Sequence, residues 1–196
     1  MASANAHERS GYSYMLNLIF RLLLTINATS LLLIVYLVQN KHTLSYFFNE
    51  ISWLYKLPNF VSYVVYSLVT ILLTWLSILL SSKLGKDAFN KGEVECIEHA
   101  NNSFLPSYLG YFFVALGINN WETLWFVYIV LFVFTFLSQA LYFNPLFLVF
   151  GYEFYNIKTK TGAAIFLISR HKYKKPDDIE IPIAYRINNY TFIERD

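Results

Sequence analysis

Four long runs of apolar residues dominate the pattern of hydrophobic and polar positions along the chain. They cover residues 15–38, 61–81, 104–118 and 124–144. None alternates with the period of two that marks a half-buried strand, and a helix needs about 20 apolar residues to cross a bilayer. The pattern therefore predicts four transmembrane helices. The third run is short, so it is either a true span or a re-entrant segment.

The pattern changes after residue 150. Two β-rich runs at residues 153–157 and 163–169 flank a turn that contains Gly162, which is typical of a hairpin. Residues 179–183 and 190–193 are candidates for a third strand. Roughly 45 residues bury little core alone, so we expect this tail to pack on another subunit, on the loop before the third run, or on a partner protein.

These patterns define a fold class and two domains. The class is an all-α membrane protein with four transmembrane helices and a small C-terminal cytoplasmic β-rich element. The transmembrane domain is expected at residues 1–150, with an outer segment at residues 41–60 and a cytoplasmic loop at residues 82–103. A cytoplasmic β-hairpin tail is expected at residues 151–196.

Charge adds an orientation to this picture. Only 14% of the residues are charged, against about 25% in an average soluble chain. With four spans, thirteen of the fifteen Lys and Arg residues fall on the side of the termini, and only Lys41 and Lys56 fall on the other. Because cytoplasmic loops carry the excess of positive charge, the sequence predicts a multi-pass plasma-membrane protein with both termini in the cytoplasm.

The outer segment at residues 41–60 is rich in aromatic residues. Leu44, Phe48, Ile51 and Tyr55 recur at helical spacing, which favours an amphipathic helix lying on the outer leaflet. A docking surface for an external ligand is the alternative.

The second run carries a face of hydroxyl residues. Its members recur at steps of three and four: Tyr63, Ser67, Thr70, Thr74, Ser77 and Ser81. In the third run, Gly110 and Gly117 offer small positions. Small and hydroxyl residues let membrane helices approach closely, so we interpret this seam as helix packing within or between subunits. A polar pore is the alternative interpretation.

Arg21 is the only charged residue within the four runs. It either extends to the cytoplasmic lipid phosphates or makes an inward polar contact, and Gln139 in the fourth run lies at a similar depth. An intramembrane acid or histidine, which proton-coupled transporters usually need, is missing from the runs.

No motif for catalysis or cofactor binding occurs in the sequence. Glu95, Cys96, Glu98 and His99 are possible metal ligands, but their spacing matches no zinc signature, so we expect no metal, no cofactor and a charged helix leading into the third run. The basic cluster at residues 170–175 fits anionic lipid head groups. We expect no direct binding of nucleic acid and no enzymatic activity.

Several stretches resemble a known family. They are Tyr142-Phe143-Asn144-Pro145-Leu146, Gly151-Tyr152, Phe154-Tyr155 and Leu167-Ile168-Ser169-Arg170. With the four runs and the small tail, they resemble the KwaA family, the membrane component of the bacterial Kiwa anti-phage defence system. The resemblance implies an inner-membrane homo-oligomer, expected to be a tetramer, and a soluble cytoplasmic DNA-binding partner resembling KwaB.

The sequence therefore predicts a non-catalytic sensor or scaffold that recruits a cytoplasmic effector. The tail residues expected to dock the partner are Phe154, Tyr155, Ile165, Leu167, Arg170, Lys174 and Lys175. An oligomeric channel or transporter is the alternative, with a pore lined by Ser67, Thr70, Thr74 and Ser77. A membrane-embedded enzyme is a third and weaker hypothesis.

Overall fold

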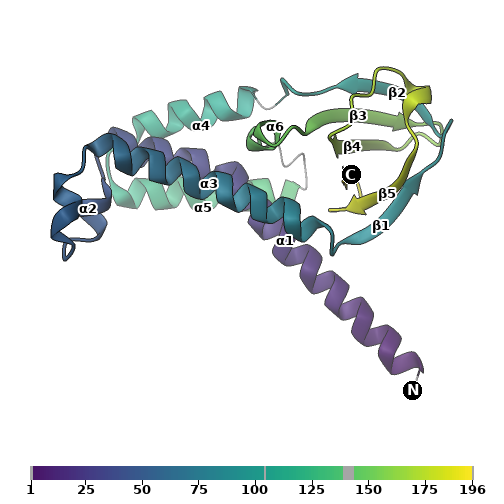
Figure 1. Cartoon of the computed structure of the whole chain (residues 1–196), viewed down its shortest axis with the longest axis horizontal. Helices are drawn as coiled ribbons and strands as arrows, with labels where there is room; N and C mark the ends of the chain where they lie inside the picture. The colour runs from purple at the N-terminus through teal and green to yellow at the C-terminus, as the bar shows by residue number, and fades with distance from the viewer. Residues whose placement is uncertain (1, 104, 139–143, 196) are drawn as a thin grey trace.

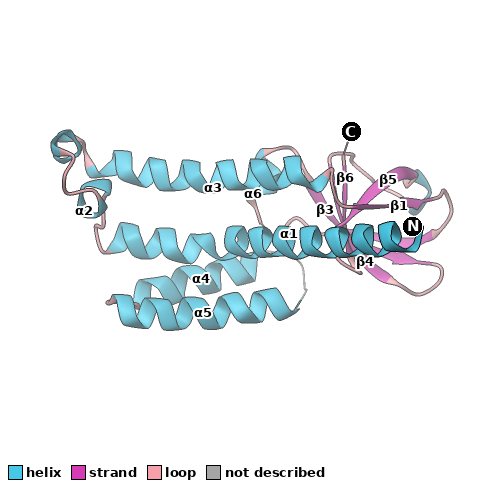
Figure 2. Cartoon of the chain, turned by 90° about the horizontal axis from the view of Figure 1, so that it is seen from below, coloured by secondary structure: helices cyan, strands magenta, loops and turns pink. Residues whose placement is uncertain are grey.

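The protein is a helical bundle that carries a β-sheet at one end (Figure 1). The computed structural model describes residues 2–103, 105–138 and 144–195. Four helices run side by side in the bundle: α1 (Ala2–Gln39), α3 (Asn59–Ser81), α4 (Leu105–Gly117) and α5 (Trp121–Ser138). α1 lies at the centre and packs against the other three. The start of α1 and the end of the last strand lie at the sheet end (Figure 2).

The prediction of four membrane-spanning helices is wrong. Within the described residues, three helices are long and apolar enough to cross a membrane, namely Met15–Gln39 of α1, α3 and α5. α4 has 13 residues, or about 20 Å at 1.5 Å per residue, against a hydrocarbon core of about 30 Å. The described residues before it are not helical, because β2 ends at His99, the Ala100 amide donates to the Phe154 carbonyl at 2.8 Å, and residues 101–103 form a turn.

The end of the bundle away from the sheet is capped by two short helices. They are α2 (Leu44–Phe47) and the 3₁₀ helix η1 (Ser52–Lys56), so the continuous amphipathic helix expected here is wrong. The His42 ring stacks on Trp121, with centroids 5.0 Å apart, and thereby fastens the cap to the start of α5. Several aromatic side chains of the cap, such as Trp53 and Tyr55, remain exposed.

The sheet is larger than the small β-rich element expected, and the prediction of an all-α fold class is therefore wrong as well. It has six strands: β1 (Gly85–Phe89), β2 (Val94–His99), β3 (Glu153–Thr159), β4 (Ala164–Ser169), β5 (Ile181–Arg186) and β6 (Thr191–Glu194). Their order is β1-β5-β6-β4-β3-β2, with β4 and β6 parallel and all other pairs antiparallel. The β3–β4 hairpin turns at Gly162, whose φ of 86° suits glycine.

Strands β1 and β2 come from the loop in which a charged helix was expected. A short turn at residues 90–93 joins them, yet they lie at opposite edges of the sheet, so the sheet must curl strongly (Figure 1). The 3₁₀ helix η2 (Pro176–Asp178) lies against β2. The tail thus packs on the 82–103 segment, one of the three alternatives that the sequence left open, and the sheet takes strands from both sides of residue 150.

Both faces of the sheet are buried. One face encloses a core formed with η2 and its flanks, made of Val94, Tyr155, Ile157, Ile165, Leu167, Ile179, Ile181, Ala184 and Phe192. The opposite face packs on the bundle through Phe154, Phe166, Ile168 and Ile193, which share one cluster with Phe20, Leu24, Ile78 and Phe147. The bundle and the sheet are therefore joined by this second hydrophobic cluster.

Candidate functional site

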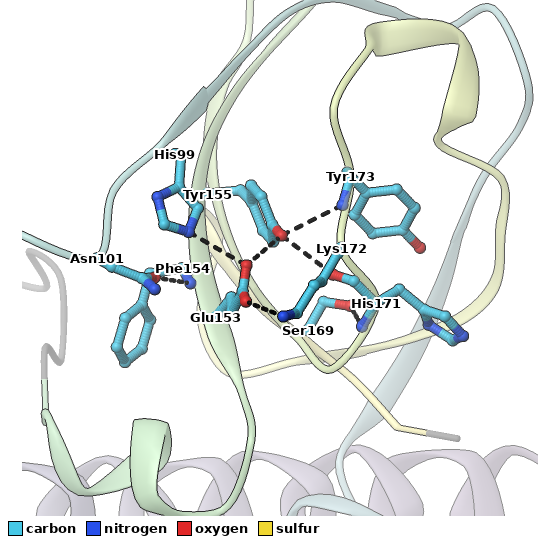
Figure 3. Close-up of polar contacts among 9 residues, drawn as sticks. All are labelled: His99, Asn101, Glu153, Phe154, Tyr155, Ser169, His171, Lys172 and Tyr173. Carbon is cyan, nitrogen blue, oxygen red and sulfur yellow. Dashed lines mark hydrogen bonds and ion pairs between the residues drawn. The ribbon is translucent and has the colours of Figure 1, made fainter.

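A network of polar side chains joins four strands at the end of the sheet next to α6 (Leu146–Val149) (Figure 3). β2 and β4 each run antiparallel to β3, and β6 runs parallel to β4, so the end of β2, the start of β3, and the ends of β4 and β6 meet there. Each strand contributes one polar side chain at this end: His99 of β2, Glu153 of β3, Ser169 of β4 and Glu194 of β6. The network brings together two carboxylates, two tyrosine hydroxyls, two histidines and a lysine: Glu153, Glu194, Tyr155, Tyr173, His99, His171 and Lys172.

Glu153 is the first centre of the network. Its carboxylate lies 3.1 Å from His99 Nε2 and 3.6 Å from Lys172 Nζ, and it accepts a hydrogen bond from the Tyr155 hydroxyl at 2.8 Å (Figure 3). Burial alone would raise the pKa of Glu153, but the hydrogen bonds from Tyr155 and His99 and the charge of Lys172 outweigh burial and hold it below its ordinary value.

Glu194 is the second centre, and it is buried. It accepts hydrogen bonds from the Ser169 hydroxyl and, at 2.9 Å, from the Tyr173 hydroxyl, and it lies 3.3 Å from His171 Nδ1. Tyr155 connects the two centres, because its hydroxyl also accepts from the Tyr173 amide at 3.2 Å. Both carboxylates are thus held by hydrogen bonds and ion pairs.

The two tyrosines act as neutral donors in this network. Burial, followed by the hydrogen bond to Glu153, raises the pKa of Tyr155 to about 12, and burial and the bond to Glu194 raise the pKa of Tyr173 further. The Ser169 hydroxyl is buried and donates to a carboxylate rather than to a histidine, unlike the nucleophile–base pair of a hydrolase. This geometry is that of a structural clamp, which fixes the 170–175 loop on the sheet.

The lowered pKa of Glu153 predicts a dependence of stability on pH. A carboxyl whose folded pKa lies below its unfolded value of about 4.5 stabilises the fold above that pH, and the contribution disappears as pH falls through the folded pKa. We expect Glu153→Gln to be less stable than wild type at pH 7, and the difference to shrink between about pH 5 and pH 3. Urea unfolding of the detergent-solubilised protein at several pH values measures this. Glu98→Gln, at an exposed position of β2, is the control, and a pH-independent difference would contradict the assignment.

The hydroxyl seam of the second run packs inside the chain. Thr74 and Ser77 are fully buried against α1 and the segment before α6. Asn27 Nδ2 donates to Ser77 Oγ at 3.0 Å, and Asn144 Nδ2 donates to Thr74 Oγ1 at 3.0 Å. Thr70 is buried too, while Ser67 is exposed. Since most of the face is filled by α1, the structure lends no support to a pore along it within one chain.

The other residues singled out within the membrane lie in different places. Arg21 points towards α5, where its guanidinium donates to the Phe136 carbonyl at 3.2 Å and lies over the Phe136 ring at 5.0 Å, which favours the inward contact over contact with lipid phosphates. Gly110 and Gly117 lie on an exposed side of α4, where a side-chain Cβ would have no other atom within 4 Å. Gln139 falls outside the described residues.

The structure divides the expected docking residues into two groups. Four belong to the sheet cores and are buried: Phe154, Tyr155, Ile165 and Leu167. Arg170, Lys174 and Lys175 are exposed on the loop held by the polar network; Arg170 also lies over the Tyr152 ring at 4.8 Å. These three side chains are accessible to a partner.

Sequence reasoning missed the carboxylates Glu153 and Glu194 and the amides Asn27 and Asn144. The sequence signal for the carboxylates is weak. Glu153 begins β3 and Glu194 ends β6, and an acidic residue at the end of a strand is usually expected to be exposed to solvent. Within the part of the chain that is described, no group of three or more His, Cys, Asp or Glu is arranged to hold a metal ion. Cys96 is an exposed free thiol.

The fold and the site define a class of protein: an apolar helical bundle compatible with a membrane location, joined through one core to a six-stranded sheet. Residues 20–193 match the sequence model of the family described as anti-phage protein KwaA. The chain therefore belongs to the KwaA family of anti-phage defence proteins. Neither a curated protein nor a solved structure matched it.

Proposed function

We propose that the chain is a non-catalytic membrane sensor and scaffold of an anti-phage complex, which recruits a soluble cytoplasmic DNA-binding effector resembling KwaB. The observation that carries this proposal is the core shared by the bundle and the sheet. Phe20 and Leu24 of α1 and Phe147 of α6 pack in one cluster with the bundle-facing residues of the sheet.

A shared core gives the bundle a mechanical connection to the sheet. Protein interiors are close-packed and transmit strain, so α1 cannot shift or rotate without repacking the sheet residues that touch it. α1 also contacts α3, α4 and α5. A disturbance felt by any of these helices would therefore reach the sheet, and this is what a membrane sensor requires.

The charge distribution supports placing the sheet in the cytoplasm. The sheet end carries most of the lysines and arginines, and the opposite cap carries Lys41 and Lys56. The excess of positive charge marks the cytoplasmic side, which would place this protein in the bacterial inner membrane with the start of α1 and the end of β6 inside. Basic side chains close to the membrane would also contact anionic lipid.

Assembly into a homo-oligomer, expected to be a tetramer, is part of the proposal. Gly110 and Gly117 of α4 have nothing packed over them in the described chain, and glycines on a membrane helix allow a second helix to approach closely. Large apolar side chains of α5, such as Phe126 and Phe134, are also exposed.

The exposed basic loop provides the test of recruitment. Reversing the charges of Arg170, Lys174 and Lys175 to Glu is expected to weaken binding of the cytoplasmic effector at least about tenfold, since charge complementarity governs such encounters. Co-purification from membranes and biolayer interferometry with the effector measure this. The matched control reverses Lys91 and Lys160, exposed in turns of the same sheet. Equal binding by the triple variant and wild type would refute docking at this loop.

A further inference from the structure

An open cleft of about 630 Å³ lies in the cap, at the end of the bundle away from the sheet. In Figure 2 this end is marked by α2. The turn after α1, the helix α2 with the residues that follow it, and η1 together form the wall. It consists of Lys41, Thr43, Ser45, Tyr46, Asn49 and Tyr55. Every one of these side chains carries a polar group, and in the described part of the wall only Lys41 is charged.

Lys41 occupies a backbone position that glycine usually fills. α1 ends in a Schellman motif, in which the His42 amide donates to the Leu37 carbonyl at 2.9 Å and the preceding amide donates to the Val38 carbonyl at 3.2 Å. The φ of Lys41 is 56°, the only positive value at a non-glycine residue in the described chain. Such strained residues cluster at ligand sites. The Lys41 side chain is exposed and forms no ion pair within the described residues, so its ammonium is available to a ligand.

Two tyrosine rings give the cleft flat apolar surfaces. Tyr46 is 52% exposed and Tyr55 is 61% exposed. The Tyr46 ring packs on the His42 ring, with centroids 4.4 Å apart, and His42 is in turn stacked on Trp121. Tyr46 is thus a fixed platform that is half open to a ligand. A ring that is already ordered loses little entropy when a ligand packs on it.

The uncharged polar side chains of the wall keep hydrogen-bonding capacity for a ligand. The hydroxyls of Thr43 and Ser45 share one hydrogen bond of 2.8 Å, which leaves one hydroxyl hydrogen and further lone pairs. In the orientation that satisfies its neighbours, the Asn49 amide donates to the Tyr46 carbonyl at 2.7 Å and keeps its oxygen as an acceptor. The cleft therefore offers donors and acceptors beside aromatic rings.

This combination selects a class of ligand. A sugar ring has an apolar face of C–H bonds, which packs on an aromatic ring, and a rim of hydroxyls, which exchange hydrogen bonds with hydroxyl and amide groups. An apolar molecule would leave the polar wall unpaired, and a small inorganic anion would not use the two rings. One ammonium matches the single charge of a carboxylate better than the nearly double charge of a phosphate monoester.

We propose that the cleft binds an acidic sugar, one whose ring carries a carboxylate. The ring packs on Tyr46 and Tyr55, its hydroxyls meet the polar wall, and the carboxylate pairs with Lys41. In the proposed orientation the cap lies outside the cytoplasm, at the end of the molecule opposite the basic loop. Sugar binding at the cap and effector binding at that loop are measured separately, so either can fail while the other holds.

Three small probes test the proposal. Methyl β-glucuronide and methyl β-glucoside differ only in a carboxylate that replaces a hydroxymethyl group, and acetate carries the charge without the ring. Saturation-transfer NMR titrations of the full chain, in nanodiscs free of glycoside detergent, measure their affinities. We expect the glucuronide to bind roughly fivefold more tightly than either other probe, the value of one ordinary hydrogen bond.

Three results with these probes would overturn the proposal. Equal binding of the two sugars would show that Lys41 does not read the carboxylate. Acetate that binds as tightly as the glucuronide would show a simple anion site. Binding of neither sugar would leave the cleft to another occupant, such as the phosphate of a nanodisc lipid.

Variants of two lysines place the charge preference at one side chain. Lys41→Gly removes the ammonium and suits the φ of 56°, so the protein should melt no lower than wild type while the glucuronide-to-glucoside ratio falls to about one. Lys41→Gln and Lys56→Gln are a matched pair, because Lys56 is exposed at the end of η1 but lies outside the wall. Only the first should lose the preference. A preference that survives in Lys41→Gly, or that Lys56→Gln also abolishes, would overturn the assignment.

Discussion

Replacing Phe154 by alanine is expected to destabilise the sheet by about 3–5 kcal/mol, the usual cost of truncating a buried phenylalanine. Phe154 is 0% exposed, stacks on Phe166 with centroids 5.7 Å apart, and contacts Phe147 of α6. A single domain has only about 5–15 kcal/mol of net stability. The loss would therefore unfold a large fraction of the sheet and release it from the bundle.

The membrane part should survive this substitution. The helices satisfy their backbone hydrogen bonds internally, and this holds for apolar helices in lipid whatever lies outside it. We therefore expect Phe154→Ala to reach the membrane fraction at wild-type levels, while protease cleaves within residues 152–195 much faster than in wild type. Limited proteolysis of isolated membranes, with mass spectrometry of the fragments, separates the two effects.

An exposed position of the same sheet provides the control. Ile183 of β5 is 42% exposed, so Ile183→Ala should change stability by no more than about 0.5 kcal/mol and leave the protease pattern unchanged. Wild-type resistance in Phe154→Ala would mean that this face of the sheet is not packed on the bundle. The shared core, and with it the mechanical argument for sensing, would then fail.

The parts of the fold that sequence predicted correctly are those encoded locally. The length of the apolar runs predicts α1, α3 and α5, and two β-rich runs around Gly162 predict the β3–β4 hairpin. The resemblance to the KwaA family is likewise confirmed. Each of these signals lies within one continuous stretch of the chain.

The strands β1 and β2 had no such signal. β1 is Gly-Lys-Asp-Ala-Phe, which is polar because one side of this edge strand faces solvent. Its partner β5 lies about a hundred residues away, and their register is supported by Asp87, whose carboxylate accepts two hydrogen bonds from Arg186 at 2.6 Å. A pairing over that distance cannot be recognised from local periodicity.

The candidate site shows the same division. The hydroxyl face of α3 was visible as a run of steps of three and four, but the sequence did not reveal what fills it. Its partners Asn27 and Asn144 are separated from it by 50 and 70 residues. The face alone favours helix packing, within or between subunits, over a pore, but it does not show which helix packs on it.

Substituting Thr74 by leucine is expected to disrupt the bundle, whereas Ser67→Leu should be tolerated. Thr74 is 0% exposed, donates to the Thr70 carbonyl and accepts from Asn144. Leucine both overfills the seam and leaves the buried Asn144 amide without its acceptor. Together these effects should cost roughly 2–4 kcal/mol. Ser67 is exposed on the same helix, and its hydroxyl donates to the backbone of that helix, so leucine there faces lipid at little cost.

Thermal unfolding and size-exclusion chromatography in detergent distinguish the two variants. We expect Thr74→Leu to unfold at lower temperature and to aggregate, while Ser67→Leu elutes as wild type does. Thr74→Ser keeps the acceptor for Asn144 and should recover most of the loss. A pore lined by the hydroxyl face predicts another result: both leucine variants would stay folded, and conductance in planar bilayers would fall in each. That result would show that the face surrounds water, and that α1 does not fill it as the hydrogen bonds of Asn27 and Asn144 indicate.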